Sequence, residues 1–267
     1  DAPDSQPEAI GGYLPLSKVY SFNPVPDTLS ADKVQLVYGV QANLFTEYIP
    51  TPEHAEMMIY PRILALAEVA WSAPSVKNYD DFHVRALKEV EALKAEGYHP
   101  FELKNEIGNR PGADQPVQHL AVGKKVAYGP DAAYYPGYSA GGDRALVDGV
   151  IGGWTYGDRR WQGFIDKKRM DVTIDMEKET EIHSVGADFM QVCGPEVFMP
   201  SEVIISVSND GKEFTELKRM EHKVVKDDKV TFINFGWEGN AKARYIRYQA
   251  SSGEFGGFLF TDEIVVK

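Results

Sequence analysis

The sequence predicts an α+β multidomain chain, in which a βα segment and a further helix are followed by an antiparallel β-sandwich. Residues 1–103 hold one short apolar run and two stretches with helical periodicity. Residues 104–118 are rich in Pro, Gly and polar side chains, which is typical of a linker. In residues 119–267 the apolar runs are short, β-branched or aromatic, and bounded by turns. We therefore expect the domain boundaries to follow these three ranges.

Composition narrows the class of partner. The 267 residues carry a formal net charge of -12, which argues against nucleic acid or an anionic membrane surface, because both reward clustered Lys and Arg. The single cysteine, Cys193, excludes an intramolecular disulfide and a cysteine-based zinc site. No apolar stretch approaches the length of a membrane span. The first residues show no signal-peptide pattern, so we expect the sequence to start inside a longer protein.

The N-terminal part alternates loop, strand and helix. Residues 34–44 form a nearly continuous apolar run, as expected for a strand buried on both faces of a parallel sheet. Thr51 and Pro52 have the residue types of an N-cap and a first helical position, and Pro61 is expected to kink the helix that follows. A second helix is predicted over 79–97, opening on acids and ending at a glycine. One βα unit and a helix do not make a domain, so this part needs further strands.

The C-terminal part reads as a series of strands and turns. Turns are predicted at 209–212 ("NDGK") and 237–240 ("WEGN"). Strands are predicted at 170–176, 200–208, 229–235, 243–251 and 258–266. Short strands at this spacing over such a length predict an antiparallel β-sandwich.

Three N-terminal stretches, "GGYLPLSKVYSFNPVP", "GVQANLFTEYI" and "YPRILALAEVAWS", closely resemble the closing segment of the family 20 glycoside hydrolases. These β-N-acetylhexosaminidases, chitobiase-like enzymes, have a (β/α)8 barrel whose final strand ends in an Asn-Leu-Trp-Thr-Glu signature at the sugar pocket. The resemblance spans roughly residues 9–103. It implies that Phe45 lines the pocket and that Glu47 binds distal hydroxyls of the sugar. Phe in place of Trp is a departure, because it loses ring area and an N–H donor.

The same resemblance implies what this chain lacks. Enzymes of this family use the acetamido oxygen of the substrate as nucleophile, in retaining, substrate-assisted hydrolysis. They need an adjacent Asp-Glu pair on an earlier strand, whereas here that dipeptide occurs only at Asp262-Glu263, in the last predicted strand. We therefore expect the C-terminal portion of a secreted, periplasmic or cell-surface hexosaminidase, with no catalytic residue of its own and inactive without the remainder of the parent barrel.

The C-terminal part has a second resemblance. "HLAVGKKVAYG", "ALVDGVIGGWTYGDRRWQGFI" and "FTDEIVV" are similar to the discoidin, or coagulation-factor type C, fold, a galactose-binding-domain-like jelly roll that includes the family 32 carbohydrate-binding modules. Many members hold a structural Ca²⁺, and the resemblance implies Asp148 and Glu263 as its ligands, beside loop carbonyls. The loop lacks the Asp/Asn-x-Thr that usually follows its "DG", so some ligands cannot be placed.

Exposed aromatic rings in Gly-rich loops are the candidate glycan-binding residues, because a flat ring can stack on the C–H face of a sugar. Phe255 and Phe258 are further candidates, and Trp161 is expected in the core. The expected ligands are glycans that contain N-acetylhexosamine or galactose. The alternative is a module without sugar affinity that packs on the barrel, or binds protein or membrane. The loop candidates are Tyr134, Tyr135, Tyr138, Trp154 and Tyr156, with Asp158, Arg159 and Arg160 nearby.

Overall fold

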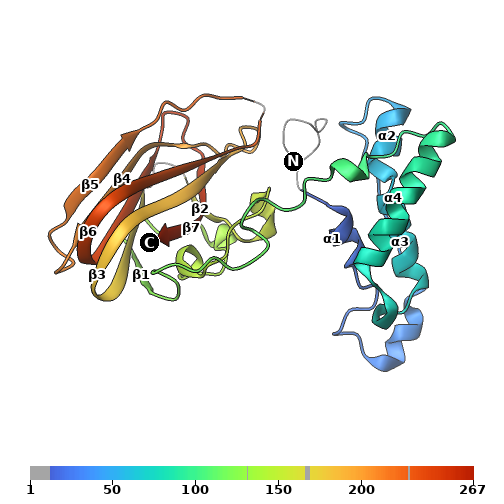
Figure 1. Cartoon of the computed structure of the whole chain (residues 1–267), viewed down its shortest axis with the longest axis horizontal. Helices are drawn as coiled ribbons and strands as arrows, with labels where there is room; N and C mark the ends of the chain where they lie inside the picture. Colours follow the sequence, from blue (N-terminus) through green and yellow to red (C-terminus); the bar gives the residue numbers. More distant parts are fainter. Residues whose placement is uncertain (1–12, 131, 166–168, 228) are drawn as a thin grey trace. The chain divides into compact units, whose positions relative to one another are not determined.

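The computed structural model describes residues 13–130, 132–165, 169–227 and 229–267. The chain divides between Gly108 and Asn109. We call residues 13–108 the helical unit and residues 109–267 the β-domain (Figure 1). Each has its own hydrophobic core. The predicted linker, 104–118, is therefore not a separate segment, because its first residues belong to the helical unit and the rest to the β-domain.

The helical unit contains four α-helices: α1 (Leu16–Tyr20), α2 (Pro52–Ile59), α3 (Arg62–Trp71) and α4 (Tyr79–Ala95). Three short 3₁₀ helices are η1 (Ala31–Leu36), η2 (Pro74–Val76) and η3 (Leu103–Asn105). The core of the unit is small, and it is built by α1, α3, α4 and η3, which contribute Leu16, Tyr20, Ala65, Phe82, Ala86, Val90 and Leu103. Within the described residues, no helix is both long enough and apolar enough to cross a membrane.

The helix signals of the sequence are confirmed at the starts. The Thr51 side chain accepts a hydrogen bond from the His54 amide (3.2 Å), and Pro52 is the first helical residue. The helix predicted to kink at Pro61 is instead interrupted there, so that two separate helices, α2 and α3, are formed. Tyr60 is extended (ψ 135°), as the residue before a proline is held out of the helical region.

The predicted strand at 34–44 is wrong. Its first residues lie in η1, and the rest is irregular backbone outside any helix or sheet, with Leu36 60% exposed and Tyr38 92% exposed. The physical reason is the lack of neighbours: a parallel strand is stable only when other strands take up its N–H and C=O groups. The described residues of the helical unit supply no such strand, so the barrel segment is not formed here.

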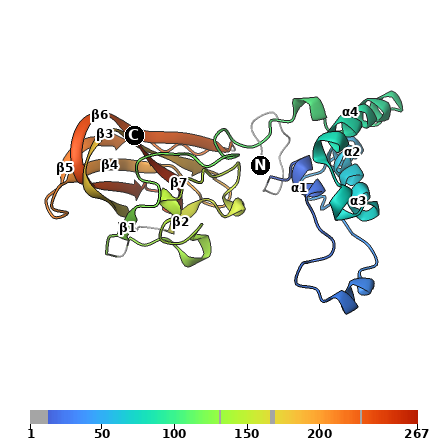
Figure 2. The same cartoon turned by 60° about the horizontal axis from the view of Figure 1, so that its bottom comes forward.

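The β-domain is an antiparallel sheet fold, as predicted (Figures 1 and 2). The strand order is β2-β7-β3-β6-β4-β5, and β1 pairs with β3. Its strands are β1 (Lys125–Tyr128), β2 (Gln162–Ile165), β3 (Met170–Gln191), β4 (Pro200–Ser208), β5 (Thr215–Glu221), β6 (Thr231–Ser252) and β7 (Phe258–Val266). The 3₁₀ helices η4 (Pro136–Tyr138), η5 (Ala145–Val147) and η6 (Tyr156–Asp158) lie in the loops between β1 and β2.

The predicted turn at 237–240 is wrong, because this stretch lies inside β6. Ser184 pairs with Glu238 and Ile182 with Ala241, so two residues of β6 oppose one residue of β3. That arrangement is a β-bulge, which can use the same Gly-Asn pair as a turn without reversing the chain. The two strands predicted at 229–235 and 243–251 are thus one long strand.

The main core of the β-domain joins alternate residues of several strands. Val172 and Ile174 of β3, Ile246 of β6 and Ile264 of β7 are fully buried in one cluster. Trp161 is buried as predicted, in a second cluster beside β2 and β7. These cores fix the loops between β1 and β2, where most of the predicted binding residues lie.

Candidate functional site

The two residues expected in the hexosaminidase pocket lie between η1 and α2, outside any helix or strand, with Glu47 in a turn. Phe45 is 69% exposed and Glu47 is also exposed. In the same segment, Gln41 Nε2 donates a hydrogen bond to Asn43 Oδ1 (2.7 Å). Among the described residues, nothing encloses Phe45 and Glu47 in a pocket, which agrees with the missing sheet neighbours.

Three of the five loop aromatics gather in the β-domain. The Tyr138 ring stands edge-on to Tyr156 (5.8 Å), Phe258 (5.3 Å) and Phe260 (4.9 Å). Tyr156 stacks on Phe260 at 4.8 Å, and Tyr135 stands edge-on to Phe258 at 5.9 Å. We call these five rings the aromatic cluster. Tyr135 is its outermost ring, 43% exposed, while burial raises the pKa of Tyr156.

Tyr134 and Trp154 contact other rings. Tyr134 packs edge-on against Tyr128 (5.3 Å) and donates its hydroxyl to Asp143 Oδ1 (2.8 Å), which raises the pKa of Tyr134. Trp154 packs edge-on against Phe232 (5.7 Å). The predicted set of five therefore does not form one surface, and the aromatic cluster is the part of it that the fold brings together.

A buried glutamine holds the loop that carries Tyr138. Gln162 of β2 donates from Nε2 to the carbonyl groups of Ser139 (3.3 Å) and Gly142 (3.0 Å). Its Oε1 accepts the Tyr128 hydroxyl at 2.8 Å. A fully buried amide whose donors and acceptor are all used fixes a loop firmly. Sequence reasoning missed Gln162, because a Gln next to the core Trp161 carries no spacing signal.

The charged residues near the loop aromatics serve the loop itself. Asp158 accepts from the amide groups of Gly153 (2.6 Å) and Arg160 (2.8 Å), and burial raises its pKa. Arg160 donates to the Ala113 carbonyl at 2.6 Å. Arg159 is exposed and has φ +66°. Asp158 and Arg160 are therefore parts of the loop scaffold.

The predicted calcium ligands do lie at one place. Glu263 of β7 is 1% exposed, and its Oε1 accepts from His119 Nε2 (2.7 Å) and the Gly149 amide (2.9 Å). Its Oε2 accepts from the Asp148 amide (3.3 Å), and Asp148 Oδ1 accepts from the Val150 amide (2.9 Å). Burial raises the pKa of both carboxyl groups, and the His119 hydrogen bond opposes that rise for Glu263.

This donor set does not fit Ca²⁺. Calcium takes six to eight oxygen ligands, whereas each Glu263 oxygen already faces an N–H donor. Among the described residues, no group of three or more His, Cys, Asp or Glu side chains converges on one point. Calcium therefore remains a sequence-based prediction that the geometry at Glu263 argues against.

A second buried carboxylate, Asp262, precedes Glu263. Arg110 donates to Asp262 Oδ2 at 2.7 Å, and the Gly152 amide donates to the same oxygen at 3.0 Å. Burial raises the pKa of Asp262 to about 6, and the guanidinium opposes this rise. The Arg110 guanidinium also lies over the rings of Trp161 (4.9 Å) and Phe232 (4.7 Å). Sequence reasoning missed Arg110, which looked like one polar residue of a linker.

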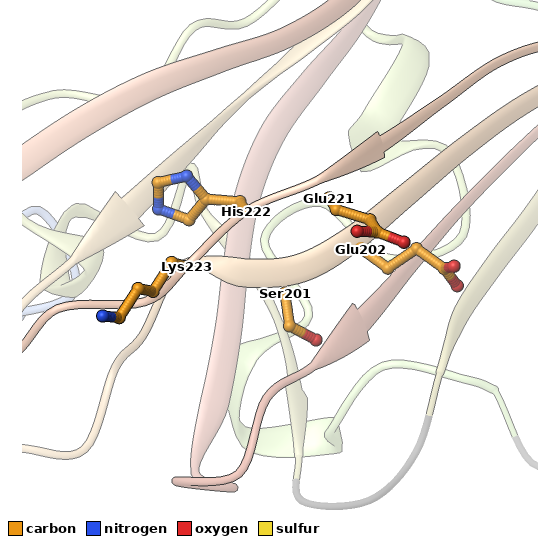
Figure 3. Close-up of a pocket in the computed structure, with 5 residues that line it drawn as sticks. All are labelled: Ser201, Glu202, Glu221, His222 and Lys223. Atoms are coloured by element: carbon orange, nitrogen blue, oxygen red, sulfur yellow. The ribbon is translucent and has the colours of Figure 1, made fainter.

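The β4–β5 edge carries a shallow open hollow of about 410 Å³. It is lined by Ser201, Glu202, Glu221, His222 and Lys223 (Figure 3). Glu202 and Glu221 are register partners on the two strands, and Arg219 binds Glu202 at 2.5 Å. None of the predicted site residues lines this hollow, so the aromatic cluster remains the candidate binding surface.

Comparison with known proteins separates the two parts of the chain. Residues 131–264 match the family model of the F5/8 type C domain. The chain belongs to the F5/8 type C family. Residues 1–74 match the model of the glycosyl hydrolase family 20 catalytic domain, so a fragment of that domain precedes the F5/8 type C domain. The predicted antiparallel fold and both predicted resemblances are thereby confirmed.

Two hexosaminidases are similar to part of the chain. A Beta-hexosaminidase of Porphyromonas gingivalis is 49% identical over 80 residues, which is 30% of this chain and 10% of that protein. A Beta-N-acetylhexosaminidase of Cellulomonas fimi is 34% identical over 79 residues, 30% of this chain and 16% of that protein. The chain thus spans a small part of each relative.

Solved structures resemble the F5/8 type C domain only distantly. A chitosan-binding module from a Paenibacillus chitosanase/glucanase is 16% identical, with a TM-score of 0.38 over 56% of this chain and 98% of that chain. A fucolectin from striped bass (Morone saxatilis) serum is 15% identical, with a TM-score of 0.40 over 57% and 49%. Likenesses at this level carry no conclusion about what this chain binds.

Proposed function

We propose that this chain is the C-terminal portion of a secreted β-N-acetylhexosaminidase, with the F5/8 type C domain as its accessory glycan-binding domain. The parent enzyme removes terminal N-acetylhexosamine from glycans by substrate-assisted, retaining hydrolysis. One observation carries the proposal: the Asn-Leu-Phe-Thr-Glu stretch at 43–47 lies inside the residues that match the glycosyl hydrolase family 20 catalytic domain. In the parent, Phe45 lines the sugar pocket and Glu47 binds hydroxyl groups of the sugar.

The remainder of the parent barrel is the proposed partner of residues 38–48. No amide group of these residues donates a backbone hydrogen bond to another described residue, and Tyr38, Leu44 and Phe45 expose apolar surface. Unpaired backbone and exposed apolar side chains on one segment are what a strand removed from its sheet presents. Neighbouring barrel strands would satisfy both.

The chain alone is proposed to be inactive. Its one Asp-Glu pair, Asp262-Glu263, is buried in β7 and held by Arg110 and His119. A general acid must reach the leaving oxygen of the substrate, and neither buried carboxylate is open to a sugar. The acid and its aspartate partner must therefore come from another part of the parent barrel.

Glycan binding by the F5/8 type C domain is proposed at the aromatic cluster. The Tyr135 ring is exposed, and Phe258 and Tyr138 support it from behind. A rigid, exposed ring of this kind can stack on a sugar with little loss of side-chain entropy. The opposite reading, a module that only packs, is favoured by Tyr138 and Tyr156, whose rings mainly contact other rings.

Two experiments test these proposals separately. Purified chain should release no nitrophenol from an aryl N-acetylglucosaminide, and turnover that survives removal of contaminating enzyme would contradict the missing-acid argument. Calorimetric titration with galactose, N-acetylgalactosamine and N-acetylglucosamine at millimolar concentration should give binding to at least one sugar, lost in Tyr135→Ala. Tyr38→Ala is the control, an exposed tyrosine of the helical unit. Silence with all three sugars would favour the packing-only module.

A further inference from the structure

The last strand of the β-domain buries two neighbouring carboxylates. Asp262 and Glu263 are each 1% exposed. The register of β7 against β3 shifts here, because Ala187 pairs with Ile264 and Phe189 with Thr261, so Asp262 and Glu263 lie in a β-bulge. A buried carboxylate is tolerated only when hydrogen-bonded or paired with a cation, and each of these two therefore needs its own partner.

Both partners come from one short stretch at the start of the β-domain, residues 110–119, which we call the strap. The strap begins with Arg110, which binds Asp262, and ends with His119, which binds Glu263. The Arg110 guanidinium is itself buried and makes a second ion pair with Asp188. The two neighbouring carboxylates are thus matched by the two ends of one segment.

The same carboxylates hold the glycine-rich loop after η5. Glu263 accepts from the Gly149 amide and Asp262 from the Gly152 amide. The strap grips the loop directly as well: the Val117 amide donates to the Gly149 carbonyl (2.8 Å), and Arg110 donates to the Gly152 carbonyl (2.8 Å). Gly149 has φ +79°, and a Cβ there would lie 2.8 Å from the Val117 carbonyl oxygen.

These contacts leave no room for a cation beside Glu263. A calcium ion within bonding distance of Glu263 Oε1 would meet the N–H groups of His119 and Gly149, which already occupy that oxygen. We propose that the strap replaces a divalent cation at the end of β7, and that the β-domain keeps its loop closed without Ca²⁺. This inference does not depend on whether the domain binds a glycan.

The first test is calcium linkage in the wild-type chain. Melting temperatures are compared in excess chelator and in excess CaCl₂, with NaCl adjusted to equal ionic strength. If a specific site exists, a free calcium concentration of about a hundred times its Kd would raise the melting temperature by several degrees. The expected result is equal melting temperatures. A rise with calcium that Glu263→Gln abolishes would overturn the proposal.

The second test removes the strap cation. Arg110→Met is expected to lower the melting temperature of the β-domain by about 5 °C or more, because it leaves Asp262 buried without a counter-charge. The matched control is Arg169→Met, which removes an exposed arginine 3.6 Å from Glu202 and should change it by about 1 °C or less. Equal effects of the two variants would contradict the role of the strap.

Two substitutions of His119 test the proposal even if Arg110→Met fails to fold. His119→Gln keeps an N–H donor that can reach Glu263, whereas His119→Ala removes it. The glutamine variant should melt closer to wild type than the alanine variant, in chelator and in calcium alike. Equal losses in the glutamine and alanine variants would show that the hydrogen bond from His119 does not hold Glu263, and the proposal would fail.

Discussion

Two apolar runs in this chain lie in opposite environments, one buried in a sheet and the other exposed. In the β-domain, Val172 and Ile174 lie in the first half of β3, fully buried, with β1 and β6 hydrogen-bonded on either side. In the helical unit, Leu36 and Tyr38 belong to a run of similar composition that is exposed and outside any sheet. The difference lies in the supply of partners, since a strand forms only where another part of the chain satisfies its backbone.

The contrast predicts unequal sensitivity to truncation of a phenylalanine. Phe189→Ala in β3 should cost about 3–5 kcal/mol of unfolding free energy, because the ring is fully buried and its loss leaves a cavity. Phe45→Ala should change stability by about 0.5 kcal/mol or less, because the ring is exposed. Urea unfolding measures both. A large loss in Phe45→Ala would show that residues 38–48 are packed in the isolated chain.

Within the helical unit, stability should depend on local signals because its core is small. The Asn78 side chain accepts from the Asp81 amide (3.1 Å) at the start of α4, so Asn78→Ala should cost about 1 kcal/mol. Asn78→Asp, which keeps the capping oxygen, is the control and should cost much less. Helical circular dichroism during thermal unfolding reports the change, and equal loss in both variants would remove the cap from the explanation.

The smallest expected effect on stability comes from a surface ion pair of the β-domain, whose contribution depends on pH. Arg244 binds Asp175 through two hydrogen bonds (2.8 and 2.9 Å), which lower the pKa of Asp175. A lowered folded-state pKa adds stability above the unfolded-state value of about 3.9, and this is lost as the pH falls through the folded-state value.

Arg244→Met should therefore cost a small amount of unfolding free energy near pH 7, and this cost should shrink as the pH falls below about 3.9. Arg144→Met, which removes an exposed guanidinium from the same domain, should show no such dependence. A cost that stays constant with pH would mean that the pair acts through packing and not through charge.

The sequence predicted those features that depend on residues close together along the chain. Thr51 and Pro52 mark the start of α2, and β4 and β7 have the predicted bounds because turn residues flank them. It could not predict the strap, because Arg110 meets Asp262 at a separation of 152 residues and His119 meets Glu263 at 144. Nothing in the neighbourhood of either residue distinguishes it from an ordinary surface side chain.

The candidate site was predictable to a similar extent. The loop aromatics were identified by residue type, and the fold gathers Tyr135, Tyr138 and Tyr156 but sends Trp154 to Phe232. The orientation of each ring depends on which strands its loop joins, and the loop sequence does not predict that topology. The support from Phe260 and Gln162 was missed for the same reason.

Hydrogen exchange of the whole chain, followed by mass spectrometry, tests most directly whether residues 38–48 lack the hydrogen-bonding partners that the β-domain has within itself. Amide groups in β3, β6 and β7 should exchange at least about a thousandfold more slowly than unstructured peptide. Peptides covering residues 38–48 should exchange at nearly the unstructured rate. Protection of 38–48 comparable to that of β3 would contradict the contrast between the two parts, since it would mean that the segment already has its hydrogen-bonding partners.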